Sequence, residues 1–237
     1  PDLDVPCRNF LLKIRCYGNH ILRVSITFGN DIPEDSSILQ ISPELVNVPL
    51  EISKSINEWI VSDAMGNKKA CFDLSEPEVD HWSDLIPGPY ETLNAIFYPD
   101  GKHWVKISAY DQFTPSRQEA FPIAFVEKNN MVRRSVISFY AEPGTCFAGT
   151  GERFGKMDLA GKTFQLENTD AQGVNSQRTY KNVPFFITNR HYGIFVNTSA
   201  HVKLSLADHS SRSIQIMAEE PYIDLFLISG NTVEEIV

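Results

Sequence analysis

Several carboxylates in the middle of the chain are the side chains best suited to chemistry. A carboxylate can act as a general acid, a general base or a nucleophile, or it can accept hydrogen bonds from a bound ligand. Glu152, Asp158 and Glu167 are isolated acids of the kind found on the solvated faces of strands. We therefore predict no catalytic residue among them.

Asp170 differs from these acids because it opens the polar run Asp170-Ala-Gln-Gly-Val-Asn-Ser-Gln177. Such polar segments are typical of binding loops, where a carboxylate can accept bonds from two hydroxyl donors. The residue types alone favour an alternative, an Asx turn in which Asp170 accepts a hydrogen bond from its own backbone.

Metal ions and cofactors are not indicated by the other reactive residue types. The cysteines are far apart and form no C-x-x-C pair, and Cys16 is expected to be a buried free thiol. The glycine-rich segment Gly149–Gly155 has Phe154 where a dinucleotide-binding loop needs its third glycine. The histidines are scattered, with no helical His-x-x-x-His pair, and they are His20, His81, His103, His191, His201 and His209.

The composition is acidic, with a formal net charge of -9, which disfavours binding to nucleic acid. No stretch is apolar enough to span a bilayer, and no signal peptide follows Pro1. These features favour a soluble, cytoplasmic protein. Because the chain begins without Met, removal of an N-terminal signal peptide is kept as an alternative.

Alternation of apolar and polar residues dominates the sequence and predicts β-strands. In His20–Phe28, for example, Leu22, Val24 and Ile26 alternate with polar residues. Turn-forming glycine and asparagine pairs separate such segments, which favours an antiparallel sandwich. The predicted strands are Phe10–Cys16, His20–Phe28, Val105–Ala109, Ser135–Tyr140, Gly193–Asn197, Val202–Leu206, Ser213–Ala218 and Tyr222–Ile228.

Two segments depart from this pattern. The proline-rich and acidic stretch Glu76–Pro99 is expected to be a long excursion between strands of one continuous β-domain. The last residues, Thr232–Val237, place Glu235 three positions after Thr232, as in a capping box, and predict the first turn of a helix.

Three ordered segments carry a resemblance to a known family. They read Gly149-Thr-Gly-Glu-Arg-Phe-Gly155, Glu167-Asn-Thr-Asp170 and Tyr180-Lys-Asn-Val-Pro, the last continuing to Asn189-Arg-His-Tyr-Gly193. The region from Thr145 to Val237 closely resembles the end of the N-terminal β-domain of glycoside hydrolase family 31. The form of these segments is more similar to the α-xylosidases than to the digestive maltases.

The resemblance implies an all-β fold, an antiparallel β-supersandwich of the galactose mutarotase type over residues 1–231. Residues 232–237 would lead toward a (β/α)8 catalytic barrel. In this family both catalytic carboxylates lie on the barrel, so the chain alone is expected to have none. The implied partners are an α-linked oligosaccharide or glycoside substrate and the barrel itself.

The resemblance also assigns roles to individual residues. Asp170, with Thr169 beside it, is implied to bind sugar hydroxyls next to the catalytic centre. Glu152 and Arg153 are expected to form an internal ion pair. Some of three aromatic residues are expected to face outward toward the barrel, and these are Phe185, Phe186 and Tyr192.

The sequence is also compatible with two other functions. One is a free-standing carbohydrate-binding or adaptor module. The other is an aldose epimerase, because the mutarotase-like fold resembles that of such enzymes. An epimerase needs an acid/base pair, typically a histidine with a carboxylate. No matching histidine motif is present, so this function ranks last.

Overall fold

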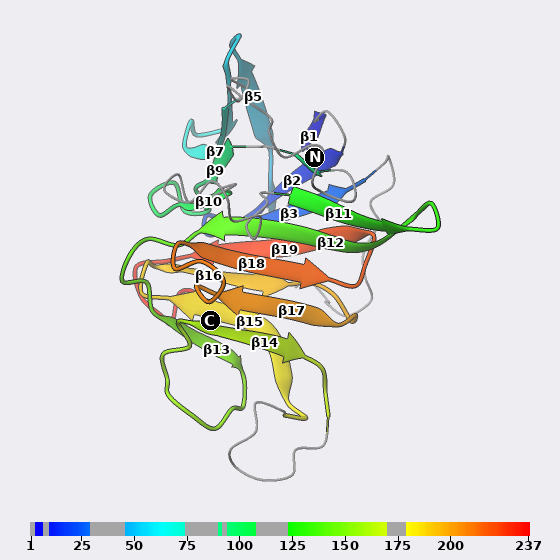
Figure 1. Ribbon diagram of the computed structural model, residues 1–237. Coiled ribbons are helices and arrows are strands. Elements are labelled where there is room, and N and C mark those ends of the chain that lie inside the picture. Colours follow the sequence, from blue (N-terminus) through cyan, green and yellow to red (C-terminus); the bar gives the residue numbers. More distant parts are fainter. Residues whose placement is uncertain are drawn as a thin grey trace.

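The computed structural model describes residues 3–6, 10–28, 46–73, 90–91, 94–107, 123–169 and 179–237. In these residues every regular element is a β-strand, and the strands form two antiparallel sheets (Figure 1). The predicted all-β class and sandwich architecture are confirmed. The same residues contain no helix long and apolar enough to cross a membrane.

The first sheet joins strands from both ends of the chain. Strand β19 lies at its centre, between β3 and β16, so the C-terminal strand is paired with the N-terminal region. In spatial order its strands are β1 (Leu3–Pro6), β2 (Leu11–Tyr17), β3 (Ile21–Thr27), β19 (Tyr222–Ser229), β16 (Tyr192–Val196), β15 (Asn182–Thr188) and β13 (Phe147–Gly151), with β4 (Asn47–Val48) also paired to β2.

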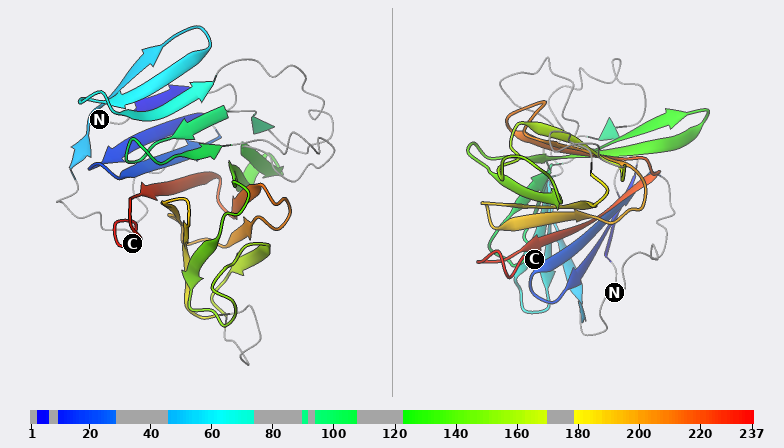
Figure 2. Two further views of the ribbon diagram at one scale, coloured as in Figure 1. Left: turned by 90° about the vertical axis from the view of Figure 1, so that its left-hand side faces the viewer. Right: turned by 90° about the horizontal axis from the view of Figure 1, so that it is seen from below.

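The second sheet packs against the first (Figure 2, right) and extends into a hairpin region, β5 to β7, that rises above the sandwich in Figure 1. In spatial order its strands are β14 (Lys162–Leu166), β17 (Val202–Leu206), β18 (Ser213–Ala218), β12 (Met131–Tyr140), β10 (Val105–Ile107), β9 (Asn94–Phe97), β7 (Lys68–Asp73), β6 (Glu58–Asp63) and β5 (Leu50–Lys54), while β11 (Ile123–Lys128) pairs with β12 and with β8 (Tyr90–Glu91).

The core lies between the sheets and follows the alternation of the sequence. Leu12, Ile14 and Cys16 of β2 are fully buried, and Cys16 is a free thiol as predicted. Facing strands of the second sheet contribute residues such as Ile216 and Phe139 to the same cluster. Alternate residues of a strand point to opposite sides of the sheet, which is why the period of two marks the buried face.

The opposite side of the first sheet holds a buried polar group that alternation alone assigns to solvent. Arg23 and Asp224 form an ion pair with an Nη2–Oδ2 distance of 2.8 Å, and both side chains are buried. Ser25 and Asn197 also donate hydrogen bonds to the Asp224 carboxylate, at 2.8 and 2.6 Å. Buried charge is tolerated when it is paired and hydrogen-bonded in this way.

The predicted excursion over Glu76–Pro99 is wrong in part. Strands β8 and β9 lie inside it, and β9 pairs with both β7 and β10. The two strands are short and follow a proline-rich stretch, so their alternation was too brief to reveal them. The rest of that segment lies outside the described residues.

Of the three aromatic residues among which some were expected to face outward, one does so in part and two belong to the core. Phe186 is 0% exposed and Tyr192 is 4% exposed, whereas Phe185 is partly exposed. Phe185 and Phe186 are neighbours on β15 and therefore point to opposite sides of the sheet. Of the three aromatic side chains, only that of Phe185 faces out of the domain.

The C-terminal residues form a single turn against the outer side of the first sheet. Glu235 N donates to Thr232 Oγ1 at 3.3 Å, and Asn231 N donates to Glu235 Oε2 at 2.6 Å. The turn buries Ile236 beside Gly193, where an added Cβ would lie 2.9 Å from both Ile236 and the Phe185 ring.

The two neighbouring phenylalanines of β15 give a test of the assigned faces. Phe186→Ala is expected to lower the free energy of unfolding by about 3–5 kcal/mol, because it empties a fully buried site. Phe185→Ala is expected to cost roughly half of that or less, because its ring is only partly buried. Urea denaturation of both variants measures the difference, and equal losses would contradict the assigned orientation of β15.

Candidate functional site

The candidate site lies at the end of the sandwich where β13 and β14 lead into long connections, at the bottom of Figure 1. Three segments meet there, and they are the three that carry the family resemblance. The first is the end of β13, the second follows β14, and the third leads into β15.

The end of β13 depends on glycine. Gly149 and Gly151 have φ values of 120° and 92°, in the region that side chains rarely adopt. A Cβ on Gly149 would lie 2.7 Å from the carbonyl oxygen of Phe185, and one on Gly151 would overlap the carbonyl oxygen of Lys181. The glycines therefore allow β13 to approach the backbone before and within β15 closely.

This approach is accompanied by a shift in strand register. Gly149 pairs with Phe186, but Gly151 pairs with Asn182. The stretch of β15 between these two partners is therefore longer than the stretch of β13 that it faces. Between the two glycines, the buried residue Thr150 has a φ of 65°, which is strained for a β-branched side chain. The bulge places Asn182 opposite the end of β13.

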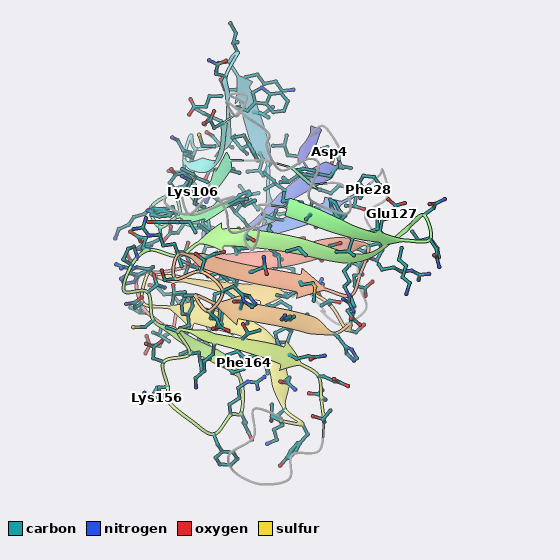
Figure 3. The ribbon with its side chains drawn as sticks, in the orientation of Figure 1. Asp4, Phe28, Lys106, Glu127, Lys156 and Phe164 are labelled. Carbon is teal, nitrogen blue, oxygen red and sulfur yellow. The ribbon has the colours of Figure 1, made fainter. Side chains whose placement is uncertain are left out.

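Arg153 uses this geometry to bridge the segments. Its Nε donates to Thr150 Oγ1 at 2.8 Å, and its Nη2 donates to Asn182 Oδ1. The guanidinium carbon lies 4.6 Å from the centroid of the Phe164 ring, which belongs to β14 and is labelled in Figure 3. Burial lowers the pKa of Arg153 from its usual value.

The expected ion pair between Glu152 and Arg153 is wrong. Glu152 instead pairs with Lys181, with an Nζ–Oε1 distance of 2.8 Å, and both side chains are exposed. Glu152 is exposed and Arg153 is partly buried, so the two neighbouring side chains have different surroundings beyond the end of β13.

Asn182 connects the two ends of the segment that holds Asp170. Its Nδ2 lies 2.8 Å from the carbonyl oxygen of Glu167 and 2.9 Å from that of Thr179. The same amide nitrogen lies 3.0 Å from Asn168 Oδ1, which also accepts a bond from Asn182 N at 3.1 Å. One side chain thus contacts the residues before and after this segment.

The two ends are also joined directly. Thr169 N donates to the carbonyl oxygen of Thr179 at 3.2 Å, and Asn168 forms a parallel bridge with Thr179. Of the predicted site residues, Thr169 is therefore held at the start of the connection, partly buried. Asp170 lies outside the described residues.

The surface around these ends carries large apolar side chains. Phe154 is 76% exposed, Met157 is 86% exposed and Tyr180 is 63% exposed. They belong to the connection after β13 and to the residues just before β15.

Asp158, another of the acids considered above, has structural partners. Asp158 Oδ1 accepts bonds from Ala160 N at 3.0 Å and Phe147 N at 3.1 Å, which ties the connection after β13 back to that strand. These two backbone donors hold the pKa of the Asp158 carboxyl below its usual value. A carboxylate committed in this way is poorly suited to proton transfer near neutral pH.

No group of three or more metal-ligating side chains occurs in the part of the chain that the structure describes. His201 lies 3.6 Å from Glu219, and Asp208 accepts a bond from Thr163 at 2.6 Å.

Sequence reasoning missed the central role of Asn182. Its segment was recognised only as part of a motif, and Arg153 was given the wrong partner. Asn182 begins β15, which is not among the strands predicted from the sequence. The only sequence signal was the residue type, since an asparagine amide can donate twice and accept.

These features define an antiparallel β-sandwich domain of the galactose mutarotase type. A family model described as the glycosyl hydrolase 31 N-terminal galactose mutarotase-like domain matches residues 11–204. The chain belongs to this family, as its three segments predicted.

The curated relatives that the chain matches include α-xylosidases. The chain is 35% identical to an α-xylosidase from Emericella nidulans over 89 residues, which are 38% of this chain and 11% of that protein. The chain therefore spans a small part of that relative's length.

Solved structures share the fold at low identity. A GH31 dextranase from Flavobacterium johnsoniae complexed with glucose superimposes with a TM-score of 0.70 at 15% identity, covering 100% of this chain and 26% of that one. A GH31 α-xylosidase from a soil metagenome complexed with xylose gives 0.65 at 14% identity, covering 98% of this chain and 32% of that one.

Two glycines with similar backbone conformations test the close approach of β13. Gly66 has a φ of 83°, and no atom lies within 4 Å of the position that an added Cβ would take. Gly66→Ala should therefore lower the free energy of unfolding only by the backbone strain, about 1–2 kcal/mol. Gly151→Ala adds a clash with a backbone carbonyl and should cost at least about 2 kcal/mol more. Thermal or urea unfolding measures both, and similar losses would argue against the tight packing at Gly151.

Proposed function

We propose that this chain is the N-terminal domain of a retaining α-glycosidase that acts on an α-xyloside or α-glucoside. The domain supplies the segment containing Asp170 to the substrate pocket of a catalytic barrel. The observation that carries this proposal is the convergence of the three family segments on the two ends of the Asp170 segment. Membership of the family and the α-xylosidase relative support it.

Asp170 is the residue proposed to bind substrate, with Thr169 holding its backbone. A carboxylate can accept hydrogen bonds from two neighbouring sugar hydroxyls, and such charge-assisted bonds are strong. Thr169 is bonded through its backbone to Thr179, which fixes the residue next to Asp170. The role of Thr169 is therefore to direct the chain toward the sugar.

The proposed contact with the barrel uses the outer side of the first sheet near the C-terminal turn. Phe185 and Phe195 are cross-strand partners and are partly exposed on this side, and Ile236 lies near the Phe185 ring beside Gly193. Partly exposed aromatic groups of this kind are common where one domain contacts another.

The 237-residue chain alone is expected to hydrolyse no α-glycoside. Retaining hydrolysis needs two carboxyl groups about 5–5.5 Å apart, and Glu152 and Asp158 are already bound to structural partners. Release of aryl α-xyloside and aryl α-glucoside leaving groups is the measurement, with a full-length family member as the active control. Turnover that disappears when one acid of this chain is replaced would contradict the expectation.

Asp170→Ala in the full-length protein is expected to lower kcat/KM by about one to two decades, with little change in melting temperature. The loss corresponds to one charged hydrogen bond of roughly 1.5–3 kcal/mol. Glu219→Gln, at an exposed acid on another part of the surface, is the matched control and should change neither quantity. A lowered melting temperature with unchanged kcat/KM would instead make Asp170 a turn-capping residue.

A further inference from the structure

We infer that Asn182 and Arg153 are positioning residues that set the separation and direction of the two ends of the Asp170 segment. They act on substrate through that segment and make no contact with sugar themselves. The inference rests on the proposed function, because it supposes that Asp170 binds substrate. It adds that the spacing of the two ends, residues 167–169 and 179–182, is set by contacts within this domain.

The first argument is the way Asn182 distributes its hydrogen bonds. Its amide nitrogen faces the carbonyl oxygens of Glu167 and Thr179, at 2.8 and 2.9 Å, on opposite ends of the segment. A side chain that bonds both ends adds to the direct bond between Thr169 and Thr179 in holding the ends together. Asp in this position would lack both donors.

The second argument is the support that Arg153 gives to Asn182. By donating to Asn182 Oδ1, Arg153 fixes which way the carboxamide points, so that the nitrogen must face the two carbonyls. The guanidinium is itself held by Thr150 and by the face of Phe164. Lysine can supply the charge, but it lacks the planar fork that bonds two partners while stacking on a ring.

The third argument is that this support begins in rigid parts of the sandwich. Thr150 is fully buried between two glycines that permit close backbone packing, and Phe164 lies in β14. Groups held in this way do not need to be ordered by substrate, which reduces the entropic cost of binding. A small displacement of such a support can lower catalysis strongly even when the support lies away from the reacting atoms.

Hydrogen exchange of the full-length protein tests the positioning role without any substrate. Asn182→Ala should speed exchange of the hydrogen-bonded amides of Thr169, Lys181 and residue 182 by about tenfold or more, while β17 and β18 stay protected. Arg153→Lys, a milder change suited to the case in which Asn182→Ala does not fold, should give a smaller increase in the same residues. The control Glu152→Gln removes an exposed ion pair from the position next to Arg153 and should leave exchange unchanged.

Unchanged exchange of these three amides in a folded Asn182 or Arg153 variant would overturn the inference. An equal increase throughout both sheets would also overturn it, because the residues would then support the fold as a whole.

Kinetics of the same protein connect the positioning role to Asp170. Asn182→Ala should lower kcat/KM for an aryl α-glycoside by about 10- to 100-fold. In the Asp170→Ala background the same change should have an effect of less than about twofold, because the residue through which it acts is gone. Full additivity of the two losses would contradict action through Asp170.

The two proposals fail in different ways. If Asp170→Ala leaves kcat/KM unchanged, the proposed substrate role is wrong, whatever the exchange experiment gives. If Asp170→Ala impairs catalysis while Asn182→Ala and Arg153→Lys do not, the positioning inference alone is wrong.

Discussion

The carboxamide of Asn182 is the interaction on which the functional end of this domain depends. It bonds the carbonyl groups of Glu167 and Thr179, and Arg153 fixes its orientation. Because one planar group bonds polar atoms from both ends of the Asp170 segment, those ends cannot separate without breaking its hydrogen bonds. The strands of the sandwich hold Arg153 and Asn182 in place. These two side chains in turn hold the ends of the segment that contains Asp170.

The glycines of β13 make that arrangement possible. Gly149 and Gly151 bring the strand against the backbone of residues 181–186, and the register shift there turns Asn182 toward Arg153. The strained Thr150 between them provides the hydroxyl that orients the guanidinium. Backbone strain is often retained where it holds a functional geometry. The glycine-rich segment is therefore neither a phosphate loop nor a flexible linker, but a site of close packing.

Alternation predicted much of the sandwich, since strands such as β2 and β18 bury alternate apolar residues and leave residues between them partly exposed. Alternation failed where both faces of a strand are buried. The ion pair Arg23–Asp224 is an example, because it is buried on the side that alternation assigns to solvent. Alternation could not orient Phe186 and Tyr192, because their phase depends on pairing with distant strands. The partner of Arg153 was also beyond sequence reasoning, since Asn182 is brought to it by the fold. The family segments predicted the fold correctly, while the roles of Asp170 and Thr169 stay predictions.

The account makes Asp170 a sugar ligand whose approach is set by Asn182 and Arg153 within this domain. A crystal structure of the full-length protein with a bound monosaccharide tests it most directly. The account predicts an Asp170 carboxylate oxygen within about 2.6–3.2 Å of a sugar hydroxyl, with the bonds of Asn182 to Glu167 and Thr179 retained. A sugar bound with Asp170 turned back onto its own backbone, beyond hydrogen-bond reach of any hydroxyl, would contradict it.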